Sequence, residues 1–112
     1  MQDKFISFLG MCRKAGKLNW GHDTCLDSIM NDRAKICLLA SDASERLKKE
    51  FLKASTYGGR ELTVIETEYS MQDIKNATGI KAGVLSTEDE GFAKKMAELH
   101  RRKSTEVIAD DQ

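Results

Sequence analysis

Apolar residues at the start of the chain recur at the spacing of an amphipathic helix. Side chains at positions i, i+3, i+4 and i+7 lie on one face of an α-helix, and a glycine commonly follows a helix end. The spacing is met by Phe5, Phe8, Leu9 and Cys12, and Gly16 comes after them. We therefore expect a first helix that buries this face and ends near Gly16.

The rest of the chain alternates continuous apolar runs with amphipathic segments. Short apolar runs with branched residues are typical of buried strands, whereas apolar residues three or four apart indicate helices. The strands are expected at residues 17–20, 35–40, 62–65 and 82–86, and the apolar faces of four later helices lie within 25–30, 47–54, 74–77 and 92–99. Asp23 or Thr24 can cap the second helix, and Ser41 or Asp42 can cap the third. Ser70 or Met71 opens the fourth helix.

This alternation of helices and strands predicts an α/β fold. It places helices on both faces of a mainly parallel or mixed sheet. The 112 residues suit one domain, which we expect over residues 1–103. The last helix should end near Arg102, and residues 104–112 are too polar to pack, so we expect an acidic, disordered tail there.

The charges are balanced in number but not in distribution. The chain has 18 basic and 18 acidic residues. Three acids, Glu106, Asp110 and Asp111, lie in the tail, so the body has 18 basic and 15 acidic residues, a net charge of +3. Basic residues also gather in residues 1–17 and 92–103. A moderately basic surface permits a polyanionic partner such as nucleic acid.

Composition and cysteine usage indicate a cytoplasmic protein. No apolar run approaches the roughly 20 residues of a membrane helix. The first residues lack the apolar stretch of a signal peptide. Cys12, Cys25 and Cys37 form an odd set without a C-x-x-C pair, so we expect reduced, half-buried thiols. Because neither a membrane helix nor a signal peptide is evident, we expect no membrane partner.

No catalytic or metal-binding motif is present. The chain lacks both the dinucleotide-binding glycine pattern and the P-loop. His22 and Cys25 stand three residues apart, but no further zinc ligands have suitable spacing. Neither His22 nor His100 accompanies a nucleophile motif. The sequence therefore predicts a protein that is not an enzyme and that binds no cofactor or metal.

The segment from Lys17 to Thr24 holds the most specific candidate site. Gly21 lets the backbone come close to a ligand, and the amides after it point outward at the positive end of a helix dipole. A plain helix cap explains the segment equally well. The candidate residues are the short polar side chains His22, Asp23 and Thr24, together with the upstream basic residues Arg13, Lys14 and Lys17.

Several segments, taken in order, resemble the ribosomal protein L7Ae family. They are Gly21-His22-Asp23-Thr24 and the stretch Arg-Ala-Lys-Ile-Cys-Leu-Leu-Ala-Ser-Asp-Ala at residues 33–43. Residues 74–79 and 82–93 agree with the second half of the family, and residues 8–18 are similar to its bacterial branch. The resemblance covers about residues 5–102, and its specificity lies in the order and spacing of the motifs.

The resemblance implies a single-domain, three-layer α-β-α sandwich with a four-stranded mixed sheet. It also implies a ribosomal-type protein that binds RNA, commonly kink-turns, in which tandem sheared G·A pairs sit beside a sharp bend. The partner would be ribosomal RNA or another kinked RNA, with association to the ribosome. In the family, the loop before the second helix reads guanine edges. The loops before the fourth helix and after the last strand close over a flipped-out base.

By position, the resemblance assigns three contacts to this chain. Lys14, Lys17 and Lys75 would supply the salt-dependent part of RNA binding. In the first contact Gly21 gives the close approach and Asp23 and Thr24 read bases; Ile74 and Lys75 belong to the second contact, and Ser86, Thr87 and Glu88 to the third.

The chain departs from the usual residues of the family at the same helix entrance. Asp23, Thr24 and Asp27 stand where the family typically has asparagine, glutamate and lysine, and residues 88–90 form an acidic loop. These acids motivate an alternative, a protein-interaction module that keeps the fold and has lost specific RNA recognition. A small enzyme is a third hypothesis, for which the sequence offers no assembled site.

Overall fold

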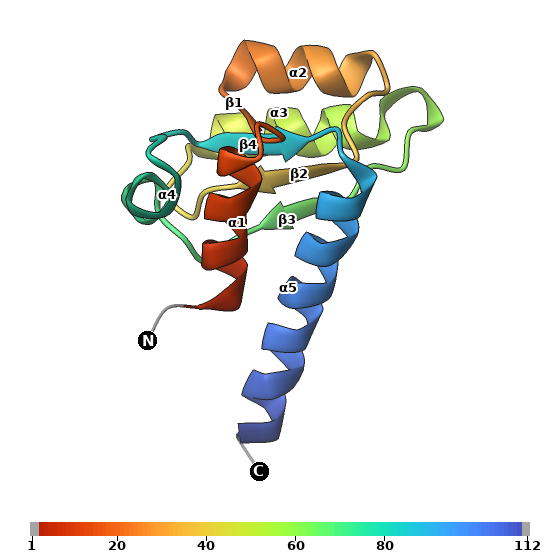
Figure 1. Cartoon of the computed structure of the whole chain (residues 1–112). Coiled ribbons are helices and arrows are strands. Elements are labelled where there is room, and N and C mark those ends of the chain that lie inside the picture. Colours follow the sequence, from red (N-terminus) through yellow and green to blue (C-terminus); the bar gives the residue numbers. More distant parts are fainter. Residues whose placement is uncertain (1–2, 111–112) are drawn as a thin grey trace.

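The computed structural model describes residues 3–110, with side chains described through residue 103. Its helices and strands alternate as expected (Figure 1). Each strand overlaps the apolar run predicted for it. The elements are α1 (Lys4–Lys14), β1 (Asn19–Trp20), α2 (His22–Met30), β2 (Ile36–Leu39), α3 (Glu45–Thr56), the short 3-10 helix η1 (Tyr57–Gly59), β3 (Val64–Glu66), α4 (Met71–Thr78), β4 (Val84–Thr87) and α5 (Glu90–Asp110).

The strands form one mixed sheet in the order β1-β4-β2-β3. Strands β2 and β3 are parallel, whereas β4 runs antiparallel to both β1 and β2. The register pairs Leu85 of β4 with Trp20 on one side and with Leu38 on the other. The predicted four-stranded mixed sheet is confirmed, and β1 forms one of its edges.

Helices cover both faces of this sheet (Figure 1). Successive side chains of a strand point to opposite faces, so β2 contributes to two cores. Ile36 and Leu38 lie in the core under α1, α4 and α5. Cys37 and Leu39 lie in the core under α2 and α3, where Phe51 is fully buried. The predicted three-layer sandwich is confirmed.

All three cysteines are free thiols, and they are fully buried rather than half-buried as expected. Burial raises the pKa of the Cys12 thiol to about 11. Burial also raises the pKa of the Cys37 thiol to about 12. Because a thiolate is the reactive form of cysteine, the raised pKa values disfavour reaction at these two buried thiols at neutral pH.

Side-chain caps begin four of the described helices. Asp3 accepts a hydrogen bond from the amide of Phe5 at 2.7 Å. Ser70, one of the two residues expected to open α4, is its N-cap and forms a capping box with Asp73. The prediction of Ser41 or Asp42 for α3 is wrong, because Ser44 accepts from the amide of Leu47 at 3.1 Å. A turn over residues 40–43 comes first, and Asp42 instead accepts from the first amide of α4. Asp89 caps α5 by accepting from the amide of Phe92.

The last helix is longer than the sequence suggested. We expected an end near Arg102 and disorder beyond it, whereas α5 continues to Asp110. No glycine or proline interrupts residues 103–110, so no local signal stops the helix. Lys103 ties α5 to the rest of the chain through Asp3, Glu68 and the hydroxyl of Tyr69. The division of the chain at residue 103 stays a prediction, and residues 111–112 lie outside the described part.

Candidate nucleic-acid interface

Helix α2 begins directly after the edge strand β1, at Gly21. The φ and ψ angles of Gly21 are 92° and 157°, a conformation that side-chain-bearing residues rarely adopt. The amide of Gly21 donates to the carbonyl of Val84 at 3.1 Å, which continues the pairing of β1 with β4. Asp23 and Thr24 therefore lie inside the first turn, and the prediction that one of them caps the helix is wrong.

The N-terminus of α2 lacks the side-chain cap that the other α-helices have. Its N-cap residue is Gly21, and no side-chain cap accepts from the amides of the first turn. Within the described part of the chain, the amides of His22, Asp23 and Thr24 have no hydrogen-bond acceptor, and the first intrahelical bond runs from Cys25 to the Gly21 carbonyl. Unpaired first-turn amides and the positive end of the helix dipole together favour an anion or another acceptor.

The side chains of this first turn are exposed, and His22 is held between two carboxylates. Its Nδ1 lies 2.8 Å from Oδ1 of Asp23, and its Nε2 lies 2.9 Å from Oε1 of Glu50 on α3. The hydrogen bonds to Asp23 and Glu50 raise the pKa of His22 above its ordinary value. Asp23 and Thr24 are open to solvent. A ligand at this helix end would therefore meet amides, a carboxylate and a hydroxyl.

A basic flank lies at the end of α1 and before β1, the strand that leads to this helix end. Arg13 and Lys14 are the last turn of α1, Lys17 follows them, and all three are exposed. Lys75 is exposed on α4. Among the residues with described side chains, none of these four has a carboxylate within ion-pair distance. Their charges are therefore available to a polyanion.

Three predicted contact residues are buried and do not join the helix entrance. Ile74 packs in the core under α1 with an exposed fraction of 1%. The hydroxyl of Ser86 donates to the sulfur of Cys25, and the hydroxyl of Thr87 donates to the carbonyl of Lys17 at 2.6 Å. These side chains hold strands and helices together in this structure, and their assignment to RNA contacts stays a prediction.

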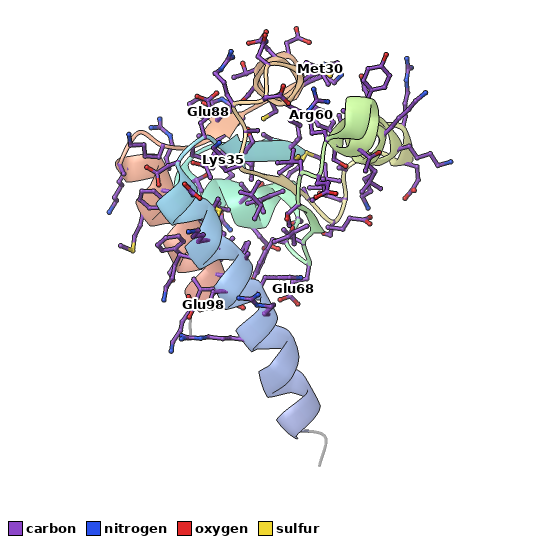
Figure 2. All side chains as sticks on the ribbon, turned by 90° about the vertical axis from the view of Figure 1, so that its right-hand side faces the viewer. Met30, Lys35, Arg60, Glu68, Glu88 and Glu98 are labelled. Atoms are coloured by element: carbon purple, nitrogen blue, oxygen red, sulfur yellow. The ribbon has the colours of Figure 1, made fainter. Side chains whose placement is uncertain are left out.

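Glu88 lies at the opposite end of β4 from the helix entrance. Val84, the first residue of β4, accepts a hydrogen bond from the amide of Gly21. Glu88 follows the last residue of β4 and lies near Lys35 (Figure 2). Glu88 accepts from the hydroxyl of Ser28 at 2.7 Å and from Nε of Arg33 at 3.2 Å. The bond from Ser28, together with Arg33, lowers the pKa of Glu88.

Arg33 also neutralises the acid that stands in the place of the family's lysine. Its Nη2 donates to Oδ2 of Asp27 at 2.7 Å. One guanidinium therefore bridges Asp27 and Glu88, two of the acids that motivated the alternative of a protein-interaction module. The sequence could not reveal this bridge, because Arg33 and Glu88 are 55 residues apart.

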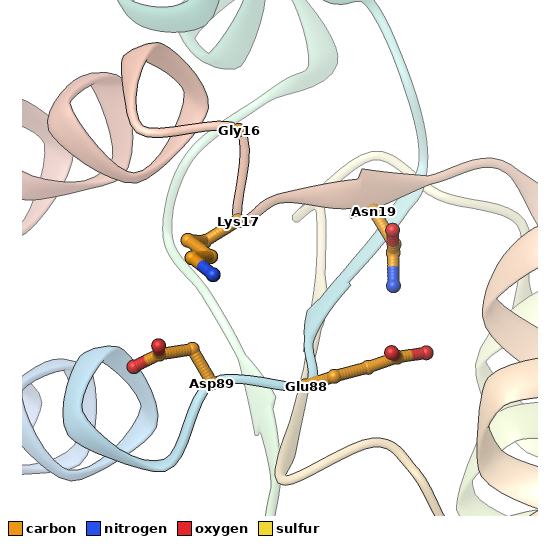
Figure 3. A pocket seen from close by; sticks show the side chains of 5 residues that line it. All are labelled: Gly16, Lys17, Asn19, Glu88 and Asp89. Atoms are coloured by element: carbon orange, nitrogen blue, oxygen red, sulfur yellow. The ribbon is translucent and has the colours of Figure 1, made fainter.

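A polar pocket of about 280 Å³ lies at the Glu88 end. Figure 3 shows Lys17 and Asn19 on one side of it and Glu88 and Asp89 on the other, with Gly16 above Lys17. The pocket carries both signs of charge. One of its carboxylates is already paired with Arg33, and the other caps α5.

The α4–β4 loop is the segment that sequence reasoning missed. Gly83 precedes Val84, so this loop, rather than the one after β4, lies beside the α2 entrance. Its Lys81 is exposed. The available signal was the pair of glycines, Gly79 and Gly83, that encloses Lys81. Glu50 was also missed, because nothing in its own helix marks it as the partner of His22.

The described residues contain neither a metal-binding cluster nor a membrane-spanning helix. No group of three or more histidine, cysteine or acidic side chains there could hold a metal ion. No helix within those residues is both long enough and apolar enough to span a membrane.

Comparisons with known proteins agree with the fold. The sequence model of the ribosomal protein L7Ae/L30e/S12e/Gadd45 family matches residues 3–97. The chain is 36% identical over 98 residues to the RNA-binding protein YlxQ of Enterococcus faecium. The matched region covers 88% of this chain and 92% of the relative. It is 28% identical over 101 residues to the RNA-binding protein YlxQ of Bacillus subtilis (strain 168), covering 86% and 94% of the two chains.

Solved structures show the same architecture. A protein with unknown function from Bacillus halodurans C superimposes with a TM-score of 0.78 at 27% identity, covering 88% of this chain and 97% of that one. The Giardia lamblia 15.5kD RNA binding protein gives a TM-score of 0.64 at 14% identity, covering 88% and 87% of the two chains. The second likeness is one of fold alone.

Proposed function

Because the chain belongs to the ribosomal protein L7Ae/L30e/S12e/Gadd45 family, we propose that it is a non-catalytic protein that binds structured RNA through the N-terminus of α2. The proposed partner is a kink-turn or a similarly bent RNA, ribosomal RNA included, and the proposed location is the cytoplasm. The observation that carries the proposal is the uncapped first turn of α2, where three amides lack an acceptor in the described structure.

The chemistry of this helix end suits the groups that a bent RNA exposes. Proteins read RNA sequence mainly at unstacked or unpaired bases, whose edges are open. The amides of His22 and Thr24 can donate to a phosphate or to a base acceptor. The exposed carboxylate of Asp23 can accept from guanine N1–H and N2–H. Open space above the Cα atom of Gly21 lets an RNA backbone come close.

Electrostatics support a salt-dependent component of binding. Each phosphate neutralised by a lysine or arginine releases counterions, so affinity falls as salt rises. Lys14 lies in the last turn of α1, Lys17 lines the pocket at the Glu88 end, and Lys75 lies on α4. Asp27 and Glu88 are paired with Arg33, which weakens the repulsion that these two carboxylates would exert on phosphates.

The test is a titration of the full chain against a kink-turn RNA and against a continuous duplex of matched length, across a salt series. We expect tighter binding to the kink-turn at every salt concentration, because base-edge contacts add to the phosphate contacts that both RNAs offer. Equal affinities that disappear together as salt rises would leave only non-specific attraction and would contradict the proposal.

Replacing Asp23 by alanine tests the base-reading role. Asp23→Ala should lower the ratio of kink-turn affinity to duplex affinity by roughly 5- to 150-fold, which corresponds to about 1–3 kcal/mol of binding free energy. The matched control is Glu66→Ala, which removes the same charge from the opposite edge strand β3. Glu66→Ala should leave the ratio unchanged. An unchanged ratio in Asp23→Ala would exclude guanine reading by this carboxylate.

A further inference from the structure

The edge strand β1 carries an exposed tryptophan, Trp20, whose exposed fraction is 41%. The guanidinium carbon of Arg13 lies 5.1 Å from the centroid of the Trp20 ring, over its face. Tryptophan is usually well buried, and a cation over its face is a specific electrostatic contact. The pair therefore joins α1 to β1 at the surface rather than in the core.

The pair lies directly beside the proposed RNA site. Trp20 precedes Gly21 in the chain, and its register partner is Leu85. Residues paired across antiparallel strands point to the same face, and Leu85 belongs to the core under α1. The Trp20 ring thus lies on the α1 face of the sheet edge, one residue before the uncapped end of α2.

We infer that Trp20 is a stacking platform for an unpaired nucleobase of the RNA bound at the α2 entrance, and that Arg13, held over the ring, binds the adjoining phosphate. The inference rests on the proposed function and extends the contact surface from the helix end onto the strand edge. Aromatic side chains stack on bases of any identity, because every base has a π face. Trp20 therefore contributes affinity rather than sequence choice.

The surrounding charges favour an RNA base over an apolar protein partner. Arg13 stands with Lys14 and Lys17, and none of these has a carboxylate within ion-pair distance among the described side chains. The exposed aromatic Tyr57 offers the contrast. Its neighbouring cation, Arg60, is bound to Asp32 at 2.8 Å, so that surface has no unpaired positive charge from Arg60.

The chain contains one tryptophan, so its fluorescence reports Trp20 directly. The experiment repeats the kink-turn titration with the full chain and follows tryptophan emission and filter retention of labelled RNA in parallel. We expect emission to be quenched in proportion to the RNA retained, because a stacked base lies against the ring. A dilution series without RNA accompanies it, since self-association through Trp20 would change emission with protein concentration alone.

Three variants accompany the titration. Trp20→Leu should weaken retention by about 5- to 150-fold, the range expected for one lost base stack. Trp20→Phe keeps a ring and should recover most of the affinity. Tyr57→Leu removes an exposed aromatic side chain elsewhere and should match the unchanged chain. Circular dichroism checks that each variant folds, and the emission of the unchanged chain remains decisive if Trp20→Leu does not fold.

The outcomes separate the inference from the proposed function. RNA that is retained without quenching, together with an affinity of Trp20→Leu within about twofold of the unchanged chain, overturns stacking and leaves RNA binding intact. Tryptophan emission that changes with protein concentration in the absence of RNA overturns base stacking and indicates that Trp20 contacts a second copy of the chain. A complete lack of retained RNA overturns both the inference and the proposed function.

Discussion

The two ends of the paired strands β1 and β4 differ in how far their polar groups are already satisfied. At the Val84 end, Gly21 opens α2 without a side-chain cap, and the described residues offer its first-turn amides no acceptor. At the Glu88 end, the carboxylate is shared between Ser28 and Arg33. The nearby Thr87 hydroxyl donates to the Lys17 carbonyl.

This difference indicates which end can gain from a ligand. A ligand that binds an already satisfied group must displace a protein partner, whereas a ligand that binds an exposed amide displaces only water. The Val84 end can therefore form new bonds with RNA. The Glu88 end holds the loop before α5 in place, and it would first have to break its own contacts.

The largest effect is expected from truncating Leu38 at the centre of the sheet, because the loss of folding stability would disturb both ends of β1 and β4. The exposed fraction of Leu38 is 1%. Leu38→Ala should lower the free energy of unfolding by about 2–5 kcal/mol, measured by urea denaturation. Leu52→Ala, which truncates an exposed leucine, is the control and should change it by about 0.5 kcal/mol or less. Similar losses in the two variants would mean that Leu38 is not a central core residue.

The next largest effect is expected from replacing the glycines on either side of β1, Gly16 before it and Gly21 after it. Gly21 and Gly16 both have positive φ angles, 92° and 72°. Open space surrounds both Cα atoms, so alanine would strain only the backbone. Each alanine variant should lower stability by about 1–3 kcal/mol. Only Gly21→Ala should also reduce RNA affinity, measured on folded protein. Equal RNA binding by the two variants would remove the distinction between the ends.

Smaller effects should come from the basic flank. Lys14→Ala and Lys17→Ala should each weaken binding to all RNAs and reduce the slope of log affinity against log salt by about 1. Lys94→Ala is the control, because Lys94 on α5 is already paired with Glu90 at 3.7 Å. Filter binding at four salt concentrations measures the slopes. Slopes that stay the same in both flank variants would place the phosphates elsewhere.

The smallest expected effect is the pH response of His22. Its hydrogen bonds to Asp23 and Glu50 raise its pKa in the folded chain. The contribution of protonated His22 to stability is therefore fully present at pH values below the pKa of His22 in the unfolded chain. It is lost as pH rises through the higher pKa that His22 has in the folded chain. Nuclear magnetic resonance titration of the imidazole should show this raised pKa. Glu50→Gln should lower it, and an unchanged value would exclude the contact with α3.

Local patterns predicted the elements well because they depend on residues close in the sequence. The apolar spacing of Phe5, Leu9 and Cys12 indicated α1 on its own, and the run at 35–40 indicated β2. The glycine that opens α2 was also visible. Its lack of a cap was not, because both Asp23 and Thr24 could have served as one.

The sequence by itself determined the alternating α/β order, the apolar faces of the helices and the helix opening at Gly21, since periodicity and glycine act within a few residues. Only the tertiary structure decided which loop meets that opening. The antiparallel pairing of β1 with β4 brings Val84 to Gly21 and moves Glu88 to the far end. It also buries Ser86 and Thr87 and lets Arg33 join Asp27 to Glu88. These contacts join residues far apart in the chain, and their partners exist only once the sheet has formed.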